Sequence, residues 1–180
     1  MSRPAVFFDR DGVVNLSPGA GYVLRWEDFH FSPGIIEALA LCRTRGYATV
    51  LATSQQGVGR KLMSQADLDL IHAKMQTHLR AHGAEFDSIY ACTCLKTDPD
   101  CLCRKPSPEM LLLAAADLDL DLSLSLLVGD ADRDIEMGTN AGVPLTIRIE
   151  SENPHIVTAT HTLSDTSGLA ELLAGLLSIC

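Results

Sequence analysis

The chain has 180 residues, of which 23 are acidic and 14 are basic, so its formal net charge at pH 7 is -9. This length suits one domain with a sizeable core. The acidic balance excludes a general nucleic-acid or membrane-surface binder, which needs a basic face, but it allows a small phosphorylated substrate held by a few local cations.

The amino-terminal residues Met1-Ser2-Arg3-Pro4 lead directly into the first predicted strand. No apolar run is long enough to span a bilayer, and no targeting signal precedes the strand. We therefore expect a cytoplasmic monomer that acts on a small metabolite and has no nucleic-acid or membrane partner.

Apolar strand patterns alternate with helical patterns along the whole chain. Strands are predicted at 5–8, 47–52, 86–91, 124–128 and 144–149. Helices are predicted from Ile35 to before Gly46, from an N-cap at Ser64 to about His82, from Pro108 through Ala114, and over 132–141 and 169–177. This alternation with short connections predicts an α/β fold, a three-layer parallel sheet with helices on both faces.

No insertion is long enough for a second domain, so we expect residues 1–180 to form one domain without a cap. The longest stretch after the first strand is the loop 16–32, which carries Trp26 and Phe29. It is either a packed flap that only covers the core or, as we favour, a flap that also borders the substrate.

The first strand ends in Asp9-Arg10-Asp11-Gly12. Two carboxylates that share one face of a strand end repel each other unless a cation or a shared proton relieves the repulsion. A hard divalent ion such as Mg²⁺ would do so. An ordinary acidic turn gives the same short pattern, so the motif depends on partners later in the chain.

Three more polar clusters are present, two after predicted strands and one before a predicted helix. They are Thr53-Ser54-Gln55-Gln56, Arg104-Lys105, and Gly129-Asp130 with Asp132 and Asp134. In a doubly wound sheet such loops converge on one crevice. Each cluster also has a local explanation, since threonine can end a strand, aspartate can cap a helix and the basic pair can be solvated.

Four of the six cysteines lie close together, at Cys92, Cys94, Cys101 and Cys103. In a chain without an export signal such a cluster indicates a metal site rather than a disulfide framework, and four thiolates favour structural zinc. Two disulfides or free thiols are the alternative. Cys42 lies in an apolar helical pattern and is expected to pack in the core.

This set of motifs in this order resembles the haloacid dehalogenase-like (HAD) phosphatase superfamily, over about 5–149. Within it, the chain is similar to the capless subgroup that holds the heptose bisphosphate phosphatases and the histidinol phosphatases. The matching residues are Phe8-Asp9-Arg10-Asp11-Gly12, Gly21-Tyr22-Val23, Thr53-Ser54-Gln55-Gln56-Gly57 and Cys103-Arg104-Lys105-Pro106. The chain departs from this subgroup at Ser54, Cys94 and Ala131, where asparagine, histidine and lysine are usual.

The resemblance implies a Mg²⁺-dependent phosphatase. Asp9 would be the nucleophile that forms an aspartyl phosphate, and Asp11 the general acid and base. Mg²⁺ would bind Asp9, the main-chain carbonyl of Asp11, and Asp130, with Asp134 near a metal-bound water. Phosphate and substrate would contact Gly21, Tyr22, Thr53, Ser54, Gln55, Gln56, Arg104 and Lys105. The zinc loop, about 92–103, would brace Arg104 and Lys105.

The implied substrate is a heptose 1,7-bisphosphate, which would lose its 7-phosphate. Histidinol phosphate or another sugar phosphate is the alternative with the same chemistry. A non-catalytic zinc-bearing binding module is the alternative from a different class, although it would not need the complete set of acids and Lys105.

Overall fold

The structure is a computed structural model that describes residues 2–152 and 155–178. Six strands form one sheet in the order β3-β2-β1-β4-β5-β6, and every pairing is parallel. The strands are β1 Ala5–Phe8, β2 Ala48–Ser54, β3 Ser88–Cys92, β4 Leu126–Gly129, β5 Leu145–Ile149 and β6 His161–Leu163. The predicted parallel α/β fold is confirmed.

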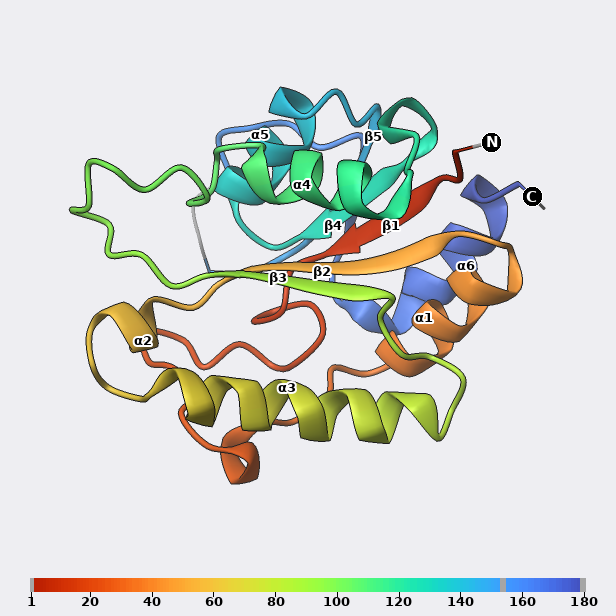
Figure 1. Cartoon of the computed structure of the whole chain (residues 1–180). Coiled ribbons are helices and arrows are strands. Elements are labelled where there is room, and N and C mark those ends of the chain that lie inside the picture. The colour runs from red at the N-terminus through yellow and green to blue at the C-terminus, as the bar shows by residue number, and fades with distance from the viewer. Residues whose placement is uncertain (1, 153–154, 179–180) are drawn as a thin grey trace.

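Helices cover both faces of this sheet (Figure 1). The helices α1 Ile35–Thr44, α3 Gln65–Arg80 and α6 Leu169–Leu176 pack on one face, and α4 Glu109–Leu118 and α5 Asp132–Asn140 on the other. A short helix, α2 Gln56–Gly59, follows the carboxyl end of β2. The sheet edge that carries the carboxyl ends of the strands is therefore left open to loops.

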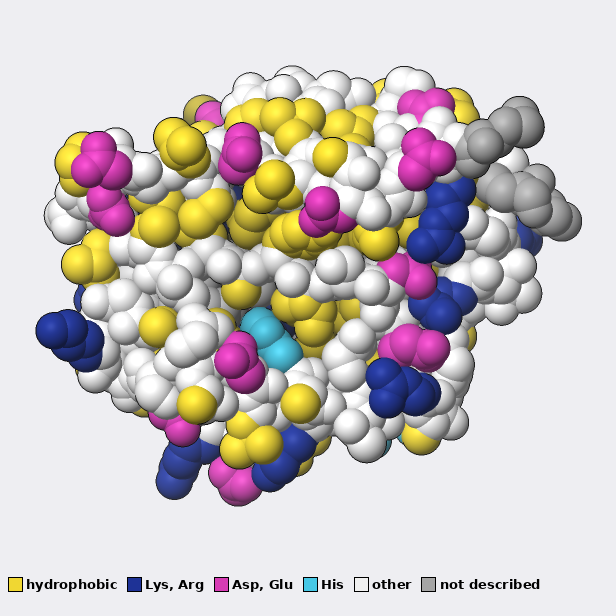
Figure 2. Space-filling model, viewed as in Figure 1, with side chains coloured by type: hydrophobic (Ala, Val, Ile, Leu, Met, Phe, Trp, Pro, Cys, Tyr) yellow, Lys and Arg dark blue, Asp and Glu magenta, His cyan; other side chains and the backbone are white. Residues whose placement is uncertain are grey.

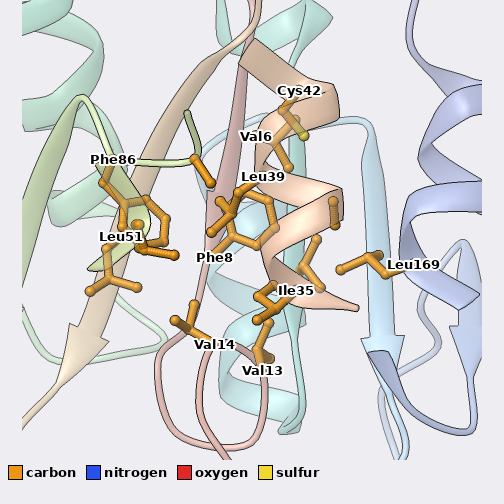
Figure 3. Close-up of a cluster of buried hydrophobic side chains, with 14 of the residues drawn as sticks. Val6, Phe8, Val13, Val14, Ile35, Leu39, Cys42, Leu51, Phe86 and Leu169 are labelled. Atoms are coloured by element: carbon orange, nitrogen blue, oxygen red, sulfur yellow. The ribbon is translucent and has the colours of Figure 1, made fainter. Parts of the chain in front are cut away.

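Alternation along β1 explains the two hydrophobic clusters. Val6 and Phe8 point to the face covered by α1, α3 and α6, whereas Ala5 and Phe7 point to the face covered by α4 and α5. Figure 3 shows Val6 and Phe8 among side chains of α1, with Leu169 of α6 beyond them. Because both faces are buried, β1 reads as an unbroken apolar run.

Most predicted elements occur within a few residues of their expected ends, but five short ones in the described part of the chain were not predicted. These are α2, β6 and the 3₁₀ helices Trp26–Asp28, Leu122–Leu124 and Thr166–Gly168. The 3₁₀ helix Leu122–Leu124 shortens the strand predicted at 124–128, which begins at Leu126. The Asp121 carboxylate accepts a hydrogen bond from Ser123 N (2.9 Å), which stabilises the turn, and Leu124 points outward with 58% of its surface exposed.

The loop 16–32 is packed over the core, which both interpretations of it expected, and its place beside the substrate stays a prediction. Its 3₁₀ helix Trp26–Asp28 places the Trp26 ring in a stack on Phe29, with ring centroids 5.2 Å apart. Phe31 then meets the Phe29 ring edge-on and stacks on His78 of α3. These contacts connect the loop to α3 through the side chains of Phe29 and Phe31.

The surface shown in Figure 2 mixes acidic and basic side chains, and hydrophobic side chains gather along α4. There Leu112 and Leu113 each keep 44% of their surface exposed. Among the described residues, no helix combines the length and apolarity that a membrane crossing requires.

Candidate active site

The carboxyl ends of β1 and β4 bring three acidic side chains together. Asp9 directly follows β1, while Asp130 and Asp134 follow β4. One carboxylate oxygen from each of the three lies within 4.8 Å of the others, and all three residues are buried. Asp9 N donates a hydrogen bond to Val128 O (3.0 Å), so the pairing of β1 with β4 continues to the nucleophile candidate and fixes its position.

Gly12 is required by this arrangement for two reasons. Its backbone φ is +87°, a conformation that L side chains rarely adopt. A Cβ atom there would also lie 2.6 Å from Asp130 Oδ2, which is too close for any side chain. The glycine of the Asp9-Arg10-Asp11-Gly12 motif therefore lets the turn after β1 approach the acid that follows β4.

Lys105 lies between two of these acids. Its Nζ is 2.7 Å from Asp9 Oδ1 and 2.8 Å from Asp134 Oδ1, and only 4% of the residue is exposed. Asp134 is held in turn by its second oxygen, Oδ2, which accepts a hydrogen bond from Ala131 N (3.0 Å). The structure therefore brings the predicted phosphate-binding lysine into direct contact with the predicted nucleophile.

Burial and mutual repulsion perturb the charges of this cluster. Burial raises the pKa of Asp9, and the neighbouring Lys105 partly offsets that effect. Burial, followed by repulsion from Asp9 and Asp134, raises the pKa of Asp130 to about 7. Burial works against the charge of Lys105, but attraction to Asp134 and Asp9 outweighs it and raises the pKa of the ammonium. The site therefore disfavours the charged forms of both Asp9 and Asp130.

These residues fit a divalent cation. If ionised, three carboxylates and one ammonium leave a formal charge of about -2 in a buried space, and Mg²⁺ prefers carboxylate oxygens. Of the expected ligands, Asp9 and Asp130 lie in this group. Asp134, expected only beside a metal-bound water, joins them. The Asp11 side chain turns to other partners, so it could contribute only its main-chain carbonyl, as the resemblance implies.

The Asp11 carboxylate is held from three directions. Arg10 Nη2 and Asn15 Nδ2 each donate to Oδ1 at 3.0 Å, and Gln55 Nε2 donates to Oδ2 at 3.0 Å. Gln55 Nε2 also donates to Thr53 Oγ1 (2.9 Å), which connects the expected acid–base residue to the loop after β2. Arg10 and Asn15 were not predicted as site residues, although both lie in the first motif or directly after it.

The loop after β2 supplies hydroxyl and amide groups. Thr53 is 1% exposed, and Ser54 has a buried hydroxyl without a hydrogen-bond partner among the described residues. Gln56 Oε1 accepts from Tyr22 Oη (3.4 Å) and from Arg60 Nε (3.2 Å), and the Arg60 guanidinium lies 5.9 Å from the centre of the Tyr22 ring. The predicted residues Tyr22 and Gln56 are therefore neighbours, joined by Arg60, which sequence reasoning missed.

Two other predicted residues lie outside the buried acidic cluster. Gly21 is exposed in the loop 16–32, where its N–H donates to Pro18 O (3.2 Å) to close a turn. Arg104 directly precedes Lys105 and is half-buried. Its guanidinium forms no hydrogen bond or ion pair with any residue described in the structure, so it is free to meet an anion.

The four clustered cysteines form a second candidate metal site. Their sulfur atoms lie within 4.8 Å of one another, with separations of 3.6 Å for Cys92–Cys101, 3.7 Å for Cys101–Cys103 and 3.8 Å for Cys94–Cys103. A tetrahedron of Zn–S bonds of about 2.3 Å has edges of about 3.8 Å. The Cys92–Cys103 separation of 2.7 Å is shorter than this edge, yet longer than a disulfide bond. All four are free thiols in this structure, so the arrangement fits zinc better than two disulfides.

A cavity of about 620 Å³ opens on the other side of Gly12. Leu16, Ser17, Gly19 and Ala20 line it from the loop 16–32, and the turns after β5 and β6 close it. Those turns contribute the acidic residues Glu150, Glu152 and Asp165. This cavity therefore carries acidic side chains on the side formed by the turns after β5 and β6.

Known proteins that are similar to this chain include phosphatases. The HAD-hydrolase-like family model matches residues 102–147. The D-glycero-beta-D-manno-heptose-1,7-bisphosphate 7-phosphatase of Vibrio cholerae is 37% identical over 160 residues, which cover 86% of this chain and 85% of the relative. The enzyme of the same name from Pasteurella multocida is 35% identical over 185 residues, covering 98% of this chain and 100% of the relative.

A solved structure agrees with these sequence relatives. The D,D-heptose 1,7-bisphosphate phosphatase of B. bronchiseptica, complexed with magnesium and phosphate, superposes with a TM-score of 0.86 at 32% identity and covers 96% of this chain and 98% of its own. The relatives from Vibrio cholerae and Pasteurella multocida are 37% and 35% identical to this chain, and each alignment covers at least 85% of both proteins. The chain therefore belongs to the haloacid dehalogenase-like phosphatases, in the family that these heptose-bisphosphate phosphatases represent.

Proposed function

We propose that this phosphatase removes the 7-phosphate of D-glycero-D-manno-heptose 1,7-bisphosphate, with Asp9 as nucleophile and Asp11 as general acid and base. The observation that carries the proposal is the position of Lys105, which pairs with both Asp9 and Asp134 beside Asp130. A phosphoryl group at Asp9 would meet that cation directly. The named relatives support the choice of sugar.

In the first half-reaction, an Asp9 oxygen attacks phosphorus and the bond to the sugar oxygen breaks. Asp11 gives its proton to that oxygen, so the sugar leaves as a neutral alcohol. In the second half-reaction, Asp11 takes a proton from water, and the oxygen of that water attacks phosphorus and releases Asp9 and inorganic phosphate. In both half-reactions, the Lys105 ammonium offsets negative charge on the oxygens of the transferred phosphoryl group.

Mg²⁺ held by Asp9, Asp130 and the main-chain carbonyl of Asp11 would shield the nucleophile from the phosphate charge and stabilise charge on the equatorial oxygens. Thr53 and the main-chain N–H groups after it would donate hydrogen bonds to the phosphoryl group. The unpaired Ser54 hydroxyl supports a place for this loop at the substrate. Asp134 holds Lys105 in position by the contact at 2.8 Å.

The second phosphate of the substrate would bind on the Lys105 side, where Arg104 offers an unpaired guanidinium that can bind an anion through two hydrogen bonds. Gly21, Tyr22, Gln55 and Gln56 would border the sugar. The acidic cavity on the other side of Gly12 disfavours a phosphate there, because Glu150, Glu152 and Asp165 would repel it.

This same acidic cavity favours histidinol phosphate as the second candidate substrate. The ammonium group of that molecule would be attracted by the carboxylates that repel a phosphate. A non-catalytic zinc-bearing module has no such support, since the acids and Lys105 meet in one buried cluster.

We further propose that Cys92, Cys94, Cys101 and Cys103 bind one structural zinc ion, which would hold the loop that leads into Arg104 and Lys105. We also propose that residues 1–180 fold as one domain, because both hydrophobic clusters share the same sheet. The expected monomeric state and the absence of a nucleic-acid partner stay predictions.

The test is release of inorganic phosphate from heptose 1,7-bisphosphate in both anomeric forms, from histidinol phosphate and from nucleoside monophosphates, with and without Mg²⁺. We expect the bisphosphate to be preferred and activity to require Mg²⁺. Comparable weak rates on all of them would reject the heptose assignment, whereas a preference for histidinol phosphate would replace it with the second candidate.

A further inference from the structure

A histidine outside every motif lies behind the expected acid–base residue. His72 is on α3, far in sequence from Asp11, and Arg10 connects the two. We propose that His72, acting through Arg10, positions the Asp11 carboxyl for proton transfer. This proposal rests on the proposed role of Asp11, and the experiment below separates the two.

The Arg10 guanidinium is completely buried and donates several hydrogen bonds to the Asp11 carboxylate. Nε and Nη2 reach Asp11 Oδ1 at 3.3 and 3.0 Å, and Nη2 also lies 3.3 Å from Oδ2. The carbonyl of Arg10 accepts the N–H groups of Val13, Val14 and Asn15, so its main chain is also fixed. A planar fork of this kind sets both the place and the plane of a carboxylate.

His72 holds the opposite side of the same guanidinium. Its Nε2 is 3.4 Å from Arg10 Nη1, a long hydrogen bond, and the residue is 8% exposed. Arginine can only donate, so Nε2 must accept and the proton must sit on Nδ1. Burial, followed by repulsion from Arg10, lowers the pKa of His72 to about 4, which agrees with a neutral acceptor ring. The Phe29 ring, 6.0 Å from the Arg10 guanidinium carbon, completes the enclosure.

Packing alone explains this arrangement poorly. A buried cation that has one carboxylate partner gains little net stability, and an apolar side chain of similar size would fill the space at least as well. His72 lies on the face of α3 that otherwise presents Leu68, Ile71, Met75 and Leu79 to the core. The contact with Arg10 explains why a polar side chain occupies that position of α3. The contact with Asp11 explains in turn why a buried arginine is present.

The test uses two kinds of substrate that differ in their need for a proton. An alkyl phosphate, such as a sugar phosphate, must protonate its leaving oxygen, whereas p-nitrophenyl phosphate releases a stable phenolate. The parameter kcat/KM reports the steps up to departure of the leaving group and is not affected by later hydrolysis of the aspartyl phosphate. A misplaced Asp11 should therefore lower kcat/KM for the alkyl ester much more than for the aryl ester.

The reference variant is Asp11→Asn, which should lower kcat/KM for the alkyl ester by about 100-fold or more and for the aryl ester by less than about tenfold. His72→Leu removes the acceptor at similar volume and should lower the alkyl value roughly tenfold and the aryl value less than about twofold. His72→Gln keeps an oxygen that can accept from Arg10 and should restore most of the activity. His82→Leu, the same change at an exposed position just beyond the end of α3, is the matched control and should leave both values unchanged.

The outcomes distinguish the proposed role of Asp11 from the proposed role of His72. If Asp11→Asn lowers both substrates equally, the proton-transfer role of Asp11 fails and the proposed mechanism fails with it. If Asp11→Asn is selective but His72→Leu lowers both substrates equally, or neither, then His72 only packs and this inference is wrong. If His72→Leu does not fold, Arg10→Lys decides, because lysine keeps the charge without the fork and should show the same selectivity for the alkyl ester.

Discussion

Replacing Asp130 with asparagine should stabilise the metal-free protein while abolishing its activity. In the folded protein, burial and then the charges of Asp9 and Asp134 raise the pKa of Asp130 from 3.8 to about 7. A shift of about 3 units corresponds to about 4 kcal/mol at about 1.4 kcal/mol per unit, which is a ceiling because the cluster can relax. We expect a gain of about 1–3 kcal/mol in the free energy of unfolding at about pH 8, measured with urea after removal of metal.

The direction of the pKa shift determines how the stability difference between Asp130→Asn and the wild type changes with pH. Because the pKa of Asp130 is higher in the folded than in the unfolded protein, the folded state binds the proton more tightly. The stability that this group contributes is complete below about pH 4 and is lost as pH rises through about 7. The difference between Asp130→Asn and the wild type should therefore be small near pH 4, grow between those values and stay constant above them.

Asp132→Asn is the matched control, because it makes the same change two residues away in a different environment. Hydrogen bonds from the main-chain N–H of Ile156 and Val157 and from Arg148 lower the pKa of Asp132. Its replacement should therefore destabilise the protein at neutral pH, the opposite sign. If Asp130→Asn were no more stable than wild type without metal at about pH 8, the account of the acidic cluster as a strained, cation-requiring site would be refuted.

Four further outcomes are expected. Asp9→Asn should abolish phosphate release while circular dichroism shows an intact fold, because Lys105 keeps its contact with Asp134; near-normal turnover would remove Asp9 as nucleophile. Gly12→Ala should lower the free energy of unfolding by about 1–3 kcal/mol, since φ is +87° and Asp130 is in the way; an unchanged urea midpoint would contradict this. A strong chelator should release about one zinc per chain, measured by elemental analysis, and lower the melting temperature; a metal-free preparation with full thermal stability would reject the zinc site. Iodoacetamide should then modify Cys94, Cys101 and Cys103, which are partly exposed, but spare Cys42 in the folded protein, because Cys42 is completely buried in α1; rapid labelling of Cys42, read by peptide mass, would show that α1 opens readily.

Long elements with clear end signals were predictable because local and tertiary preferences agree in them. For α3, Ser64 Oγ accepts from Asp67 N (3.1 Å) while Asp67 Oδ2 accepts from Ser64 N (2.8 Å), a reciprocal cap that the N-cap residue announces. Gly83, with φ of +65°, then stops the chain from continuing as a helix. Such signals depend on a few neighbouring residues, and the sequence displays all of them.

Short elements, and contacts between residues far apart in the chain, were harder to predict from the sequence. The three residues of β6 become a strand only because β5 offers its edge, as in the pairing of Arg148 with Thr162. Likewise, His72 occupies a core-facing position of α3, where a histidine usually only fills space. What could have drawn attention to it is the conflict between its polarity and its apolar neighbours, but the partner, Arg10, is visible only in three dimensions.

Asp134 shows why a local and a functional explanation of one residue need not compete. From the sequence, an acid at the start of a helix is a cap, and a cap needs no ligand. In the structure, Oδ2 accepts the N–H of Ala131 while Oδ1 pairs with Lys105, so the same carboxylate fixes the start of α5 and the lysine. Gly129 is required for this, because a Cβ there would lie 2.3 Å from Asp134 Cβ. The helix that follows β4 thereby fixes the position of Lys105, the proposed phosphate-binding cation, and for this reason the lysine can stay buried beside Asp9 before any phosphate arrives.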